Sequence, residues 1–179
     1  MIAEILSTGD EVLTGAIVDS NSAYIAEQLV LHGVDVARHI CVGDDREALV
    51  AIFKEISTRA GIAVVTGGLG PTADDLTAET MAMAAGAELV FSEAADRSIA
   101  NFFKKFGRPR SDSDKKQAMI PAGAECLLNP VGTAPGFMLK IGKCYFFCVP
   151  GVPSEMREML SDSVLPFIQK LTGNDRKFF

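Results

Sequence analysis

The chain has 179 residues, of which 48% are hydrophobic and 22% charged, proportions that suit a soluble globular domain with one core. The formal net charge of −6 argues against direct binding to nucleic acid, which favours a basic surface. The four cysteines form no C-x-x-C pair and the two histidines are isolated, so the sequence gives little support to a zinc site. Without a long apolar run, we expect a cytoplasmic protein with free thiols and no membrane contact.

Strand-like and helix-like segments alternate along the chain. The candidate strands are apolar runs at 3–7, 34–42, 62–66, 88–91, 125–129, 136–141 and 143–149. Apolar residues recur at helical spacing over 49–60, 95–106 and 156–171, where Pro166 is a candidate kink. This order predicts an α/β fold whose parallel strands are covered by helices on both faces. The last two strands, joined at Gly142, predict a hairpin and hence some antiparallel pairing.

The first two strands are each followed by adjacent carboxylates. Asp10 and Glu11 stand beside Gly9, and carboxylate oxygens are ligands that suit a divalent cation. A hydrophilic turn is an equal alternative there. After the second strand, Asp44 and Glu47 have the spacing of a capping box, so the favoured interpretation of Asp44 is a helix N-cap.

The segment 64–77 says most about function. An apolar strand enters three glycines and a proline, and two carboxylates, Asp74 and Asp75, precede a helix-like stretch. Glycines at a strand end let backbone N–H groups approach a ligand, and the helix that follows favours an anion. The spacing matches neither a P-loop nor G-x-G-x-x-G. We predict a phosphate site here, with a tight turn capped by exposed aspartates as the alternative.

Three later segments complete the candidate site. The polar stretch 104–117 is either a solvated loop or a lid, and from it Lys116 could offset phosphate charge. The turn at 129–136 could close over a ligand. In the segment 149–157, Pro153 suits the first turn of a helix, and the N–H groups around Ser154 could receive an anion.

Taken together, these segments resemble those of a known family, the N-terminal domain of the CinA (competence/damage-inducible protein) proteins, within the MoaB/MogA molybdopterin-binding-like fold. The resemblance rests on pieces in family order at 7–15, 19–21, 42–44, 66–77, 116–118, 132–137 and 150–156. Leu69, where the cofactor-biosynthesis branch typically has threonine, favours the CinA branch.

The resemblance implies a three-layer αβα sandwich that binds a pterin or nucleotide, and it implies metal-dependent hydrolysis of ADP-ribose or a related dinucleotide. Asp44 and Asp75 match paired aspartates that work with a cation in adenylyl-transferring relatives. We therefore assign catalysis to Asp75, Asp44 and Lys116, and a Mg²⁺, Mn²⁺ or Co²⁺ site to Asp10, Asp44 and Asp75. The expected ligand-binding residues are Gly9, Thr66, Gly67, Gly68, Leu69, Gly70, Thr72, Asn129, Gly132, Pro150, Gly151, Pro153, Ser154 and Glu155.

The same residues leave two alternatives open. One is a module that holds molybdopterin, or another pterin phosphate, without turnover; the other is an interaction domain that serves a further region of a longer protein. We expect one domain at 1–172, with 173–179 a tail or the start of a linker, and a homo-oligomer, as is common in this fold.

Overall fold

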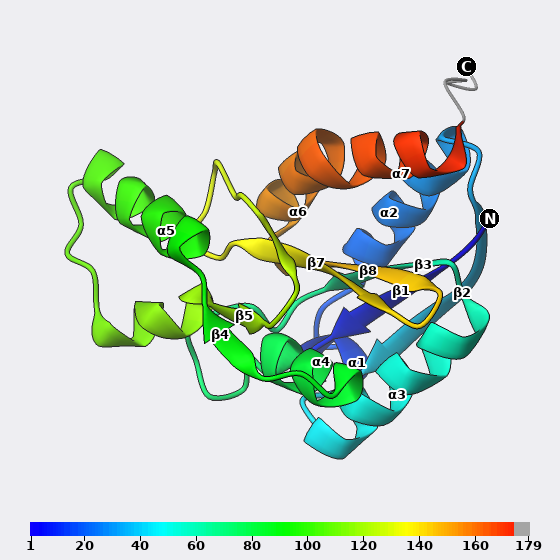
Figure 1. Cartoon of the computed structure of the whole chain (residues 1–179), viewed down its shortest axis with the longest axis horizontal. Helices are drawn as coiled ribbons and strands as arrows, with labels where there is room; N and C mark the ends of the chain where they lie inside the picture. Colours follow the sequence, from blue (N-terminus) through cyan, green and yellow to red (C-terminus); the bar gives the residue numbers. More distant parts are fainter. Residues whose placement is uncertain (174–179) are drawn as a thin grey trace.

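Six strands form the central sheet, in the order β2-β1-β3-β8-β7-β6 (Figure 1). The computed structural model describes residues 1–173. The parallel strands are β1 (Ile2–Thr8), β2 (Asp35–Val42), β3 (Ile62–Thr66) and β8 (Cys144–Val149). Antiparallel to β8 runs β7 (Gly136–Ile141), followed by β6 (Glu125–Leu127), which confirms the predicted hairpin.

Helices cover both faces of this sheet, so the predicted three-layer α/β fold is confirmed. On one face lie α2 (Ser20–Leu31), α6 (Pro153–Met159) and α7 (Leu165–Thr172), and on the other α3 (Arg46–Arg59) and α4 (Thr77–Ala85) (Figure 1). Strand β3 shows why both faces need cover. Ile62 and Val64 enter one core cluster and Ala63 and Val65 the other, as the two-residue period of a strand requires.

The hydrogen-bonding pattern of the last helical stretch changes just before Pro166, the residue predicted as a candidate kink. A π-helical segment, Leu160–Val164, joins α6 to α7. Pro166 falls in the first turn of α7, where the missing N–H group is tolerated. The extra residue of the π-helical turn is a common cause of a local bend.

A small subdomain, which the sequence only partly predicted, extends from one side of the sheet (Figure 1). It contains β4 (Leu89–Phe91), α5 (Glu93–Lys105), a 3₁₀ helix (Asp112–Ala118) and β5 (Met119–Pro121). Strand β4 was predicted, but its antiparallel partner β5 was not. The stretch 104–117, for which a solvated loop or a lid was predicted, is exposed at 104–109, and its second half enters the 3₁₀ helix, where Asp114 and Gln117 are buried.

One charge is buried in the central sheet. Glu4 in β1 is only 2% exposed, and its two carboxylate oxygens accept hydrogen bonds of 2.8 and 3.0 Å from Arg59 at the end of α3. Arg38 stands 4.0 Å away. The bidentate geometry compensates the desolvation of the carboxylate, and the pKa of Arg59 is raised by these hydrogen bonds.

We therefore predict that Arg59→Met lowers the free energy of unfolding by about 3 kcal/mol, because it leaves a buried carboxylate without its partner. The double variant Glu4→Leu with Arg59→Met recovers most of this loss, since an apolar pair of similar size needs no desolvation. Arg97→Met is the matched control: its partner Glu93 is exposed, and the loss stays below about 0.5 kcal/mol. Urea denaturation measures all three, and an equal loss in control and test would contradict the prediction.

No helix in residues 1–173 has both the length and the apolar character needed to cross a membrane. The cytoplasmic location and the homo-oligomer stay predictions. The expected tail or linker falls on 174–179, outside the described residues, apart from Gly173.

Candidate functional site

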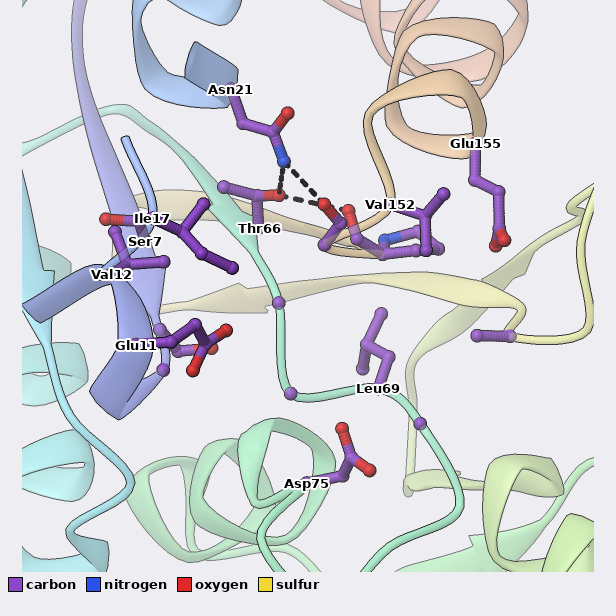
Figure 2. A pocket seen from close by; sticks show the side chains of 18 of the residues that line it. Ser7, Glu11, Val12, Ile17, Asn21, Thr66, Leu69, Asp75, Val152 and Glu155 are labelled. Atoms are coloured by element: carbon purple, nitrogen blue, oxygen red, sulfur yellow. Dashed lines mark hydrogen bonds between the residues drawn. The ribbon is translucent and has the colours of Figure 1, made fainter. Parts of the chain in front are cut away.

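A cleft of about 710 Å³ opens at the carboxyl ends of β1, β3 and β8 (Figure 2). This is the edge at which open α/β sheets bind ligands. The segments at 9–11, 43–45, 66–75 and 150–154 all contribute to its lining, as the sequence predicted. Residues far apart in the chain therefore share one site.

The floor of the cleft is the glycine turn that follows β3. Gly67 has φ 108° and Gly68 has φ 64°, and a Cβ atom on them would lie 2.6 Å from the Thr8 carbonyl oxygen and 2.4 Å from Thr77 Oγ1, respectively. Only glycine fits this close, left-handed path. Thr77 fixes the turn by donating to the carbonyl oxygens of Gly67 and Gly68, at 2.8 and 3.1 Å.

The N–H groups of this turn are free for a ligand. Among residues 1–173, those of Gly68, Leu69 and Gly70 have no protein acceptor. Successive unpaired N–H groups in such a turn make a concave anion site. This arrangement fits the phosphate-binding role predicted for the segment.

Asn21, at the start of α2, ties three segments of the cleft together. Its Nδ2 donates to Thr66 Oγ1 at 3.1 Å and to the Gly151 carbonyl at 2.8 Å, while Thr66 donates to the Pro150 carbonyl at 3.0 Å (Figure 2). We had not predicted Asn21 as a site residue. The sequence signal that could have identified Asn21 was its place in the segment 19–21, which the CinA family shares. That segment also has the pattern of a helix start, and Asp19 does cap α2.

Carboxylates gather on the opposite side of the cleft, around the short helix α1 (Asp10–Leu13). Asp10 and Asp44 are joined by reciprocal bonds between backbone N–H and carboxylate, at 3.3 and 3.0 Å. Burial raises the pKa of Asp44. The hydrogen bond from the Asp10 N–H lowers this pKa, whereas the negative charges of Asp10, Glu11 and Asp74 raise it. These four carboxylates, Asp10, Glu11, Asp44 and Asp74, are called the acid cluster below.

The interpretation of Asp44 as a helix N-cap was wrong by one residue. Asp45 caps α3, since its side chain accepts from the Ala48 N–H at 2.7 Å. Asp44 therefore does not cap α3, and it lines the cleft.

The cleft carries negative charge without a basic side chain to balance it. Its lining residues within 1–173 include no lysine, arginine or histidine, whereas the carboxylates are Glu11, Asp19, Asp44, Asp74, Asp75 and Glu155. A phosphate-bearing ligand would meet repulsion in this field unless a cation accompanied it.

Asp75 lies across the glycine turn from Thr66 and is held by its own loop (Figure 2). Its Oδ2 accepts from the Thr72 N–H at 2.8 Å and from Thr72 Oγ1 at 2.6 Å. Lys116 does not line the cleft: its ammonium group donates to the carbonyl oxygens of Thr72 and Asp75, the latter at 2.8 Å. Thr72 and Lys116 thus position Asp75.

Glu155 lines the far end of the cleft, across from Glu11 (Figure 2). Its carboxylate accepts from Asn129 Nδ2 at 2.6 Å. Asn129 and Gly132 themselves contact Glu155 rather than the cleft, and Ser154 is exposed beside it.

The residues present fit a cation that is coordinated partly by a phosphate of the ligand, and not a cation coordinated by protein side chains alone. Within residues 1–173, no group of three or more His, Cys, Asp or Glu side chains is arranged to hold a metal ion. Mg²⁺ characteristically takes one or two carboxylates together with substrate phosphates and waters. Asp44, which lines the cleft and for which no basic group of residues 1–173 contributes to the pKa shift, matches that smaller requirement, and Asp10 holds it in place.

Most of the predicted site residues line the cleft. The predicted residues that line it are Gly9, Asp44, Thr66, Gly67, Gly68, Leu69, Gly70, Thr72, Asp75, Pro150, Gly151, Pro153 and Glu155. The predicted residues outside the lining are Asp10, Lys116, Asn129, Gly132 and Ser154. Lining residues that we did not predict include Asn21, Ile17, Val18, Gln117 and Thr133.

Comparison with known proteins agrees with the fold. A family model described as a probable molybdopterin binding domain matches residues 4–170. A CinA-like protein of Desulfosudis oleivorans is 51% identical over 178 residues, which are 99% of this chain and 43% of that protein. A Shewanella oneidensis protein named nicotinamide-nucleotide amidohydrolase PncC is 42% identical over 99% of this chain and 42% of its own length.

Solved structures give the same picture. The CinA protein of Thermoplasma acidophilum, whose function is unknown, superposes with a TM-score of 0.81 at 36% identity, over 89% of this chain and 94% of that one. The molybdopterin biosynthesis enzyme MoaB of a Thermus species superposes with a TM-score of 0.64 at 19% identity, over 96% of both chains, a likeness of fold alone.

The chain spans about two fifths of the length of the curated relatives it matches. Over that length, the family match, the relatives and the architecture agree. The chain belongs to the probable molybdopterin binding domain family, among its CinA-like members.

Proposed function

We propose that this domain is a nucleotide-related hydrolase that cleaves the diphosphate bond of ADP-ribose or a related dinucleotide, with a divalent cation. The observation that carries the proposal is that one cleft contains both the free N–H groups at 68–70 and several carboxylates, with no lysine, arginine or histidine among its lining residues within 1–173. A diphosphate with its cation would meet both features: its phosphate oxygens would accept from the free N–H groups, and its cation would bind the carboxylates.

The glycine turn and the carboxylates have different roles in this proposal. The N–H groups of Gly68, Leu69 and Gly70 hold one phosphate, and the 150–153 turn borders the second. Asp44, which lines the cleft and is held in place by its reciprocal bonds with Asp10, would hold the cation, while Asp75, positioned by Thr72 and Lys116, would orient the attacking water. When bound, the cation would neutralise charge on the phosphates and make water a better nucleophile.

The name of the Shewanella oneidensis relative supports a nucleotide as the ligand class. That relative is more than twice as long as this chain, so its name does not assign amide hydrolysis to this domain. If this chain released ammonia from nicotinamide mononucleotide, amide hydrolysis rather than diphosphate cleavage would be its reaction.

A second candidate follows from the family description. A probable molybdopterin binding domain could hold a pterin phosphate in the same cleft without turnover. The two functions differ in outcome: a binding module retains its ligand intact, whereas a hydrolase releases AMP.

We predict that the protein releases AMP from ADP-ribose, and more slowly or not at all from FAD, only when Mg²⁺, Mn²⁺ or Co²⁺ is added. Chelation with EDTA should abolish turnover and leave the melting temperature within about 2 °C, because the acid cluster is not a closed structural cage. Chromatography of the nucleotides and a thermal melt measure both. Full turnover in EDTA would exclude the metal-assisted mechanism, and tight pterin binding without AMP release would favour the binding module.

We further predict opposite results for two neighbouring aspartates. Asp44→Asn should lower turnover by about 100-fold, since it removes a cation ligand, yet slightly raise the melting temperature, since it relieves repulsion in the acid cluster. Asp45→Asn is the matched control: asparagine caps α3 as well as aspartate does, so activity and stability stay near the parental values. Equal activity of the two variants would remove Asp44 from the mechanism.

The stabilisation by Asp44→Asn should depend on pH in a defined direction. Folding raises the pKa of Asp44 above its ordinary 3.8, so the folded protein disfavours the charged form. That penalty is complete above the folded-state pKa and disappears below pH 3.8. The melting temperatures of parent and variant should therefore converge as the pH falls from 7 to below 3.8, and a gap that is constant over this range would contradict the electrostatic explanation.

A further inference from the structure

The Glu155 end of the cleft is constructed differently from the acid cluster. Asn129, which is 3% exposed, donates through Nδ2 to Glu155 at 2.6 Å and to the Ala134 carbonyl at 2.9 Å, and its Oδ1 accepts from the Val131 N–H at 3.1 Å. These bonds fix which way the amide faces. One carboxylate oxygen of Glu155 is thus held by a buried, oriented donor.

The turn at 129–134 is also shaped around this carboxylate. A Cβ atom on Gly132 would lie 2.1 Å from Glu155 Cδ, so the carboxylate lies directly against the glycine backbone. A larger residue at 132 would displace the Glu155 carboxylate from its present position. The Asn129 amide holds the carboxylate by a hydrogen bond, and the lack of a side chain at Gly132 leaves room for it there.

Within residues 1–173, no basic side chain forms an ion pair with Glu155. Burial raises the pKa of its carboxyl group, which the Asn129 hydrogen bond partly offsets, and no charged group of the described residues 1–173 contributes to the shift. Arg157, on the same helix, lies over the Tyr24 ring, 4.6 Å from its centroid. The first turn of α6 offers some favourable dipole, but a half-buried, unpaired carboxylate still lowers stability. Such a cost indicates a role in the cleft.

An ionised carboxylate only accepts hydrogen bonds, so its ligand must present a donor. A phosphate would be repelled there, whereas a neutral hydroxyl or amino group would be bound. Val152, 50% exposed on the same rim, adds an apolar surface that suits the body of a sugar. The free N–H groups at 68–70 and the acid cluster meanwhile suit the phosphates.

We propose that Glu155 binds the hydroxyl groups of a substrate sugar and thereby sets the direction in which the substrate lies in the cleft. The sugar occupies the end formed by 129–134 and Glu155, and the phosphates lie over the glycine turn. This assignment rests on the proposed nucleotide ligand and extends it to a substrate class, diphosphates that carry an unmodified ribose.

Binding of three monophosphates tests the proposal without requiring turnover. Isothermal titration calorimetry with Mg²⁺ compares AMP, 2′,3′-dideoxy-AMP, which lacks the sugar hydroxyls, and purine riboside monophosphate, which lacks the amino group. The parent should bind AMP about tenfold more tightly than dideoxy-AMP, the usual effect of a hydrogen bond to a charged group. Purine riboside monophosphate should bind like AMP.

The variants decide whether Glu155 is responsible. The tenfold preference should fall below about twofold in Glu155→Ala and to an intermediate value in Glu155→Gln, which keeps the shape of the side chain. Glu158→Gln, an exposed glutamate on the same helix outside the cleft, should keep the full preference. Thermal melts confirm that each variant is folded, and Glu155→Gln carries the test if Glu155→Ala is not.

Three results would overturn the inference. A preference for AMP that persists in both Glu155 variants assigns the hydroxyl contact elsewhere, and loss of affinity only for purine riboside monophosphate assigns a base amino group to this end. AMP and dideoxy-AMP that bind the parent equally leave the nucleotide proposal intact but reject the sugar contact. No binding of any of the three nucleotides would reject the nucleotide ligand itself, and with it this inference.

Discussion

The path of the chain after β3 is the constraint on which the rest of the site depends. Gly67 and Gly68 pass so close to Thr8 and Thr77 that a Cβ atom on either would overlap an oxygen. Because β3 is buried on both faces, the strand cannot shift to relieve such a contact. The turn is therefore rigid, and the ends of β1 and α4 that meet it are fixed relative to the N–H groups at 68–70. A rigid turn presents its donors to a ligand without further reorganisation.

Much of this arrangement could be predicted from the sequence, because the strands of the central sheet are short apolar runs that end in glycine, proline or carboxylates. Parallel order then places those ends together. The small subdomain was harder: β5 is three residues long, and its pairing with β4 depends on contacts across the chain that no local pattern encodes. The π-helical turn escaped prediction for a similar reason, because the apolar stripe of 156–171 continues through it.

The site residues divide along the same line. Glycines and carboxylates at strand ends were found because their types suggest chemistry, whereas Asn21 was missed because a polar residue at a helix start is ordinarily explained by capping. The Asp44–Asp45 pair shows the limit most clearly. Both residues suit a helix start, and only the backbone geometry decides that Asp45 caps α3 while Asp44 lines the cleft.

The charges of the cleft favour a ligand that binds together with a cation. The buried carboxylate Glu4 has Arg59 to compensate it, so the fold can supply a counterion where only stability is at stake. Among residues 1–173, none of the residues that line the cleft is basic; the carboxylates of the acid cluster repel each other there, and Glu155 is held by a neutral amide. Unbalanced charge of this kind lowers the stability of the empty protein and strengthens binding of a cation with its phosphates. The contrast between the two environments is the strongest physical reason to regard this edge of the sheet as the site of action.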